Sequence, residues 1–280
     1  LPGQNFLSCI AGTLTKRPTL VTYHGAVEFN DSHTTKGRLR QWYVRKNASR
    51  VIVVCDFVGN LMKSMGFPSD KVVRIYNGID TVKFKNCISG LTRQELGITS
   101  STSVITMVAN IRESKGYDYF VRAAAETLVC YPNTLFLAVG DIDPGLGAPL
   151  RTLVKELGLE KRFKFLGFRE DIPEILSDSD IFVLSSISEG LPLVMLEAMA
   201  SGKPMVVTQC GGPQEVLEDG KTACLVPPAD VSKLSEKISY LLNKREEADN
   251  LGRNAMAKVD RDFTLEGMLQ KYEALYQATI

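Results

Sequence analysis

Short runs of β-branched and aliphatic residues recur along this chain of 280 residues, separated by segments with helical patterning. They include RVIVV at 50–54, SVITMVA at 103–109, TLFLAV at 134–139 and PMVVT at 204–208. Strands that are apolar along their whole length are typical of parallel sheets covered on both faces. Regular strand–helix alternation also requires right-handed crossover connections. We therefore predict an α/β protein with parallel sheets.

A polar stretch interrupts this alternation. Residues 79–100 are polar and irregular, so we expect a domain boundary within them. The predicted parts are a first domain over residues 1–85, a second over 86–262 and a final helix over 263–280. The first part supplies two or three strands, whereas a complete doubly wound domain has about five or six. We therefore expect the first domain to be incomplete and the second to be complete.

The charge balance argues against a general nucleic-acid binder, because 33 Lys and Arg face 32 Asp and Glu. No apolar run reaches the roughly 18 residues of a membrane-spanning helix, and no segment has the pattern of a basic amphipathic membrane helix. No signal peptide is visible. Several cysteines lie in apolar, strand-like runs, so we expect buried free thiols in a reducing compartment and a cytoplasmic location. With two histidines and six scattered cysteines, a Cys/His zinc site is not expected.

Two glutamates flank a turn and a helix start. Glu189 lies in a Gly/Pro turn, and Glu197 lies about two turns into the helix expected over residues 193–200. Free backbone N–H groups and the helix dipole bind anions at such a start. Carboxylates suit paired hydroxyls, so the spacing predicts a ligand with a phosphate between two sets of hydroxyls, as in a nucleotide-sugar. The alternative is that both glutamates are solvated residues without a ligand.

Four segments together resemble family 4 of the retaining glycosyltransferases, which have the GT-B fold. They are His24-Gly25, IYNGID at 75–80, the Lys115-Gly116 turn and the block that runs from Glu189 to Gly220. The resemblance covers nearly the whole chain. It implies two Rossmann-like domains that face a cleft, the N-terminal one lacking its first part, and a last helix that crosses back to it. It also implies a retaining, metal-independent hexosyltransferase of polysaccharide or glycolipid synthesis.

The resemblance also implies roles for single residues. Glu189 contacts hydroxyls of the transferred sugar, and Glu197 contacts the ribose. Lys115 neutralises the charge that develops on the departing diphosphate. His24 lies near the reacting centre, at the turn that faces the cleft. The backbone that holds the phosphate consists of Gly190, Leu191, Pro192 and Leu193.

Other candidate positions follow predicted strands. Asn110 stands where the family usually has an arginine, and Arg112 lies two residues later. Arg112 is therefore either a second phosphate contact or a surface residue. Phe168 and Arg169 are candidate contacts to the nucleobase, because the family holds the base at this segment. Neither D-x-D string is predicted to be a metal site. The string at 178–180 is predicted to be an acidic turn, whereas Asp141 and Asp143 follow a strand end that is better placed for contact with a ligand.

The expected partners are a UDP- or GDP-linked sugar as co-substrate and a sugar, glycan or lipid-linked acceptor. No other cofactor, metal or nucleic acid is expected, and peripheral contact with the inner face of a membrane is compatible with such acceptors. One alternative is a truncated nucleotide-sugar-binding module without transferase activity, because the family's N-terminal Gly-rich loop is not found. A phosphorylase on the same fold would need a lysine-bound pyridoxal cofactor, for which the sequence gives no sign.

Overall fold

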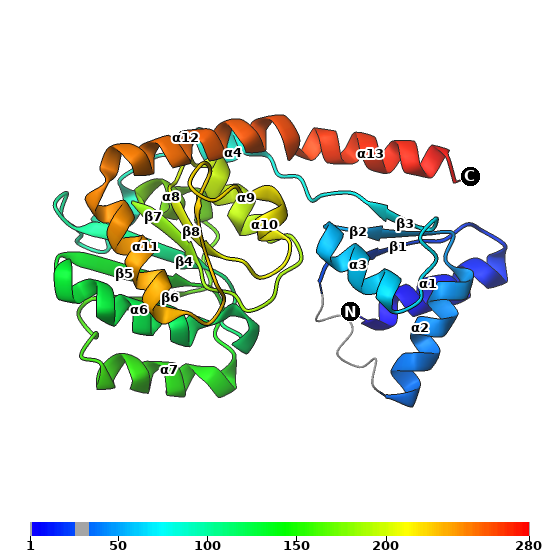
Figure 1. The fold of residues 1–280 in the computed structure, drawn as a ribbon, viewed down its shortest axis with the longest axis horizontal. Helices are drawn as coiled ribbons and strands as arrows, with labels where there is room; N and C mark the ends of the chain where they lie inside the picture. Colours follow the sequence, from blue (N-terminus) through cyan, green and yellow to red (C-terminus); the bar gives the residue numbers. More distant parts are fainter. Residues whose placement is uncertain (1, 26–33, 280) are drawn as a thin grey trace.

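The computed structural model describes residues 2–25 and 34–279. These residues form two parallel sheets accompanied by helices (Figure 1). The predicted α/β class with parallel sheets is therefore confirmed.

The smaller sheet has three parallel strands in the order β1-β2-β3. Their bounds are β1 Leu20–Tyr23, β2 Arg50–Val53 and β3 Val72–Arg74. Three helices accompany it, namely α1 (Pro2–Thr15), α2 (Thr35–Asn47) and α3 (Asp56–Ser64). We call this sheet and these helices the smaller unit. Helix α1 was not predicted, because it contains two glycines, which disfavour helix, and no charged residues.

The larger sheet has six parallel strands in the order β6-β5-β4-β7-β8-β9. Their bounds are β4 Ser103–Val108, β5 Thr134–Val139, β6 Phe163–Gly167, β7 Ile181–Leu184, β8 Met205–Thr208 and β9 Cys224–Val226. The strand order reverses between the neighbours β4 and β7. Ligands bind to open α/β sheets at such a switch point, beyond the carboxyl ends of the strands. The fold therefore points to the segments that follow β4 and β7.

Helices cover the larger sheet, and we call the sheet and its helices the larger unit. Every residue of β5, β7 and β8 is buried, as expected of strands covered on both faces. The helices are α6 (Tyr117–Cys130), α7 (Pro144–Glu156), α8 (Ile172–Asp178), α9 (Leu193–Ala200), α10 (Pro213–Val216), α11 (Val231–Asn243) and α12 (Arg245–Asp262).

The expectation that residues 79–100 are irregular is wrong in two places. Helix α4 (Thr81–Lys85) begins at Asp80, whose carboxylate accepts N–H groups of the first turn. Helix α5 (Leu91–Glu95) begins where the Asp178 carboxylate accepts backbone N–H groups of Gly90, Thr92 and Arg93. Helix α4 packs against α8 and α9, and α5 packs against α8. These tertiary contacts stabilise helices too short to be stable alone.

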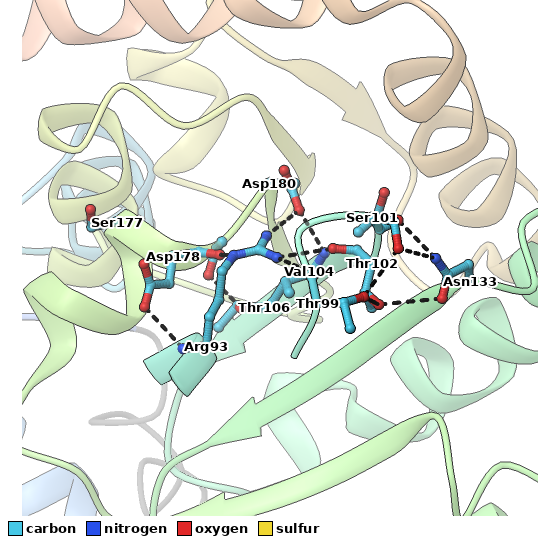
Figure 2. Close-up of polar contacts among 12 residues, drawn as sticks. Arg93, Thr99, Ser101, Thr102, Val104, Thr106, Asn133, Ser177, Asp178 and Asp180 are labelled. Carbon is cyan, nitrogen blue, oxygen red and sulfur yellow. Dashed lines mark hydrogen bonds and ion pairs between the residues drawn. The ribbon is translucent and has the colours of Figure 1, made fainter. Parts of the chain in front are cut away.

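Asp180 extends this anchor, as Figure 2 shows. Its carboxylate accepts the backbone N–H of Val104 and pairs with the Arg93 guanidinium at 2.8 Å. The acid string at 178–180 therefore joins α5 to the start of β4. Asp143 in the other string accepts the Gly145 N–H at the start of α7. The contacts of Asp178 and Asp180 agree with the acidic turn predicted for 178–180.

The C-terminal segment returns toward the smaller unit. Helix α13 (Leu265–Gln277) continues from α12 along the upper edge of the molecule in Figure 1. Ile79 forms an isolated parallel bridge with Thr264, and the Gly78 N–H donates to the Met268 sulfur. The segment after β3 is therefore held by the start of the last helix.

Candidate functional site

A lysine and a glutamate meet at the switch point of the larger sheet. Lys115 ends the 3₁₀-helix η2 (Glu113–Lys115) after β4, and Glu189 lies in the turn after β7. The Lys115 Nζ lies 2.5 Å from Glu189 Oε1, and the Ser186 hydroxyl donates to the same oxygen at 2.7 Å. The Glu189 side chain is only 10% exposed. A buried carboxylate needs such partners to remain charged.

A glycine permits this approach of the two turns. Gly116 has a φ of +64°, and a Cβ built on it would lie 2.3 Å from the Ser185 carbonyl oxygen. Only glycine tolerates both the left-handed backbone and this contact. The Lys115-Gly116 spacing therefore places the lysine against the end of β7.

A pocket of about 500 Å³ opens beside this ion pair. It lies between the ends of β4, β5 and β6 and the first turns of α9. The polar and aromatic candidates that line it are Asn110, Arg112, Lys115, Phe168, Arg169 and Glu197, together with Pro192 and Leu193 at the start of α9. The structure therefore brings most of the predicted site residues to one cavity.

Helix α9 contributes both an anion-binding end and a carboxylate to this pocket. Its first amides, those of Leu193 and Val194, have no acceptor one turn earlier in the helix. Glu197 lies one turn further along the same wall. Burial raises the pKa of the Glu197 carboxyl, and the charge of Lys83 offsets this rise only in part. Glu197 is thus a partly desolvated carboxylate, not the solvated surface residue of the alternative interpretation.

Arg112 is exposed and lines the pocket beside Asn110. The Asn110 side-chain oxygen accepts the Asp141 N–H at 3.3 Å, so it is partly committed to the neighbouring turn. Arg112 also faces a larger cavity of about 780 Å³ between η2, α6 and α7. It is therefore placed at the rim of the pocket, with its side chain accessible to a ligand.

Phe168 and Arg169 differ in what they can offer a ligand. The Phe168 ring is 63% exposed at the pocket. The Arg169 guanidinium makes four hydrogen bonds at 2.6–2.7 Å, two to Glu95 and two to Asp171. These carboxylates raise the pKa of Arg169 further above its ordinary value. Arg169 therefore links α5 to the loop after β6. Few of its N–H groups remain free to donate to a nucleobase.

Gly190, which has no side chain, allows the site to contact the smaller unit. A Cβ built on Gly190 would lie 1.8 Å from the carbonyl oxygen of His24, the exposed residue that follows β1. Leu191 is buried, and its carbonyl accepts the Asn77 side-chain N–H at 2.9 Å. The turn after β7 is thus in contact with the segment after β1, through His24, and with the segment after β3, through Asn77.

Glu215 makes a contact between the two units that was not predicted from the sequence. It lies on α10, and its two carboxylate oxygens accept the backbone N–H groups of Asp56 and Phe57 at 2.7 and 2.5 Å. A carboxylate of the larger unit therefore caps α3 of the smaller unit. The signal available in the sequence was its place after Gly211-Gly212-Pro213, in the block that carries the family resemblance.

Potential metal ligands do not gather among the residues that the structure covers. Within residues 2–25 and 34–279, no group of three or more His, Cys, Asp or Glu side chains could hold an ion.

Sequence comparisons agree with this geometry. Residues 90–258 match the family model "Glycosyl transferases group 1", and residues 2–83 match "Glycosyltransferase Family 4". The chain is 34% identical over 210 residues to the "N-acetyl-alpha-D-glucosaminyl L-malate synthase" of Bacillus anthracis, covering 75% of this chain and 54% of that protein. It is 27% identical to the Escherichia coli "UDP-Gal:alpha-D-GlcNAc-diphosphoundecaprenol alpha-1,3-galactosyltransferase", covering 96% and 72%. The chain thus spans about half to three quarters of these relatives.

Solved structures share the whole fold. The Anabaena protein Alr3699/HepE in complex with UDP superposes with a TM-score of 0.89 at 25% identity, over 99% of this chain and 77% of that one. The sucrose-phosphate synthase of Thermosynechococcus elongatus superposes with a TM-score of 0.84 at 26% identity, over 98% and 71%. The predicted GT-B arrangement of two parallel-sheet units is therefore confirmed.

Proposed function

Because this chain belongs to the glycosyl transferases group 1 family, we propose that it moves a hexosyl group from a nucleotide-diphosphate sugar to an acceptor hydroxyl. The observation that carries the proposal is the pairing of Lys115 with Glu189 at the switch point, beside the amide end of α9. A cation, a carboxylate and free helix amides at one place suit a diphosphate between two sets of hydroxyls.

The donor would occupy the 500 Å³ pocket along α9. Its diphosphate lies at the amides of Leu193 and Val194, and its ribose hydroxyls face Glu197. The exposed Phe168 ring is suited to stacking on the base. Arg169 supports the loop that carries Phe168. The UDP complex of the Anabaena protein supports uridine as the base, with GDP-linked donors as the competing choice.

The chemistry would depend on Lys115. When the bond between sugar and diphosphate breaks, negative charge develops on the leaving group, and a cation already in place stabilises it without reorganisation. Arg112 at the pocket rim can add a second positive charge. In this proposal the transfer retains the anomeric configuration and needs neither a divalent metal nor an organic cofactor. Glu189 orients the transferred sugar, and His24 faces it from the smaller unit.

The acceptor is proposed to be a sugar, a glycan or a lipid-linked glycan, as in polysaccharide or glycolipid synthesis. The E. coli relative supports this class, because its name includes a diphosphoundecaprenol-linked sugar. The B. anthracis relative is named for a malate product, so acceptors differ among the proteins that this chain matches.

Calorimetry with UDP and GDP tests the donor site. Removing a hydrogen bond to a charged group costs about tenfold or more in affinity, so Lys115→Ala and Glu197→Ala should each weaken UDP binding at least that much. Lys233→Ala and Glu236→Ala remove an exposed ion pair on α11 and serve as controls. The site assignment is wrong if all four variants bind UDP like the parent chain.

Turnover is measured separately, as UDP release from UDP-sugars with and without a chelator. Transfer that continues with the chelator supports the metal-independent route. Intact UDP binding without transfer to any sugar, glycan or lipid-linked acceptor would instead identify a donor-binding module.

A further inference from the structure

A second cavity opens beside the donor pocket. It has a volume of about 780 Å³ and lies between η2, α6 and α7. The two helices pack against each other and lie side by side in Figure 1 (green). Ile111, which follows β4, and Ile187, which follows β7, both line the cavity. It therefore opens beyond the carboxyl ends of the two strands that flank the switch point, where open α/β sheets bind ligands.

Arg112 connects this cavity with the donor pocket, because it lines both. On the other side of the cavity, Ile187 is 39% exposed and lies two residues before Glu189. A molecule in the cavity would therefore lie next to the place proposed for the transferred sugar.

Apolar side chains form much of the lining. Ile111, Tyr117 and Leu150 are buried below the surface of the cavity, whereas Tyr119 and Leu153 are partly exposed in it. The volume lies within the range of about 300–1,000 Å³ that is usual for small-molecule sites, and such sites combine apolar walls with a few polar groups. The cavity thus has the size and the walls of a ligand site.

Charged side chains of both signs complete the lining. They are Arg112, Glu113, Asp118, Arg122 and Glu156. None of these side chains makes a hydrogen bond or an ion pair with another residue in the part of the chain that the structure describes. Their N–H groups and carboxylate oxygens can therefore all bind a ligand.

The mixture of groups selects the chemistry of that ligand. Three carboxylates against two guanidinium groups disfavour a polyanion, and a wholly apolar ligand would cover these charges without offering them partners, which is costly. A hydroxyl group can donate to a carboxylate and can accept from a guanidinium group. A pyranose ring has hydroxyls at its edge and C–H groups on its faces, so it suits both kinds of lining.

We propose that the cavity between α6 and α7 is a binding site for a neutral oligosaccharide. The sugar hydroxyls contact the charged side chains, and the C–H faces of the rings lie on the apolar ones. Because Arg112 connects the cavity with the donor pocket, this sugar is the part of the acceptor glycan that lies away from the reacting hydroxyl. The identification as acceptor rests on the proposed function, whereas the binding itself does not.

Saturation-transfer NMR on the whole protein tests the binding. The probes are neutral di- and trisaccharides of glucose, galactose, mannose and N-acetylglucosamine, each with and without UDP, and calorimetry measures UDP affinity in parallel. We expect at least one probe to bind. If UDP binds and none of the sugars does, this proposal fails and the proposed function stands. If a sugar binds and UDP does not, the proposed function fails and the sugar site stands.

A double variant locates the site. Arg122→Ala/Glu156→Ala removes one guanidinium and one carboxylate from the cavity and leaves the net charge unchanged. The loss of hydrogen bonds to charged groups should weaken sugar binding about tenfold or more. The control Lys233→Ala/Glu236→Ala removes an exposed pair of opposite charges from α11 and should bind like the parent chain. A sugar affinity that is equal in the two double variants overturns the assignment to this cavity.

Ala148→Trp tests the cavity without changing any charge. Ala148 is exposed and lines the cavity, so an indole ring at this position should occupy the space and exclude the sugar. Ala257→Trp, at an exposed position of α12, is the control. UDP affinity shows whether each variant keeps its fold and its donor pocket. If the sugar binds Ala148→Trp as tightly as Ala257→Trp, the proposal fails.

Discussion

At the residue scale, the two glutamates that flank the turn after β7 have different surroundings. Glu189 shares one oxygen with Lys115 and Ser186, so its charge is neutralised inside the protein. Glu197 lies on the pocket wall, where burial raises its pKa. The spacing in the sequence predicted that the two glutamates contact hydroxyls on opposite sides of a phosphate. In the structure, the Glu189 carboxylate pairs with Lys115, whereas the Glu197 carboxylate is partly desolvated and lines the pocket.

Glu189→Gln should separate binding from turnover. The amide no longer neutralises Lys115, so the cation is freer to bind a diphosphate, and UDP affinity should stay equal or rise. Transfer should fall about tenfold or more, because a charged contact to the sugar is lost. Calorimetry and UDP release measure the two effects, with Glu236→Gln as the control. A variant that loses UDP affinity and transfer together contradicts this role.

Glu197→Gln should stabilise the fold at neutral pH. The raised pKa means that the folded state disfavours the ionised carboxylate, so its cost is absent at low pH and appears as pH rises through the folded pKa. The amide removes that cost but weakens UDP binding. Denaturant unfolding at neutral pH and below the ordinary Glu pKa of 4.5 measures the difference. A stability gain that is the same at both pH values would falsify this explanation.

At the element scale, sequence patterns predict the positions of strands well, but they do not predict several of the helices. The apolar runs at 50–54, 103–109, 134–139 and 204–208 coincide with β2, β4, β5 and β8 to within one residue at each end. Apolar runs suffice because parallel strands are buried on both faces. Helix α5 needs Asp178, a residue more than 80 positions away, to cap its start. Local pattern cannot predict a helix whose stability comes from such a distant carboxylate.

The contact between α10 and α3 yields a prediction at this scale. Glu215→Gln keeps the shape of the side chain but weakens both hydrogen bonds to the α3 amides. A charged cap contributes about 1 kcal/mol, so the two units should separate more often. Small-angle scattering should show a larger radius of gyration and proteases should cut more readily near residue 80. Glu218→Gln is the control, because Glu218 pairs with Lys221 and Lys258 inside the larger unit.

At the scale of the whole molecule, backbone contact joins the two units. Gly190 lies against the His24 carbonyl, and a Cβ built on Gly212 would lie 3.2 Å from the sulfur of Cys55, the residue before α3. Side chains at these positions would force the backbones apart. Glycines in the turn after β7, which the sequence indicated only as part of a ligand-binding turn, therefore also allow the two units to come into contact.

Gly190→Ala tests this apposition. The added Cβ would lie 1.8 Å from the His24 oxygen, so the units must move apart. UDP should still bind to the larger unit, while transfer to an acceptor should fall about a hundredfold, since a misplacement of about 1 Å can cost that much. Gly3→Ala, where a Cβ meets no atom within 4 Å, is the control. Transfer at the parent rate in Gly190→Ala would contradict the role of this contact.

The sequence by itself determined the parallel α/β fold, the order of the strands along the chain and the gathering of Lys115, Glu189 and Glu197 near one sheet edge. These follow from local patterns and from the geometry of parallel connections. Only the tertiary structure decided that the Arg169 guanidinium donates its hydrogen bonds to Glu95 and Asp171. It also decided that Glu215 caps α3 and that Gly190 lies against the His24 carbonyl. The Glu95, Glu215 and Gly190 contacts join residues more than 70 positions apart. Distant contacts of this kind depend on how elements pack, which no local pattern encodes.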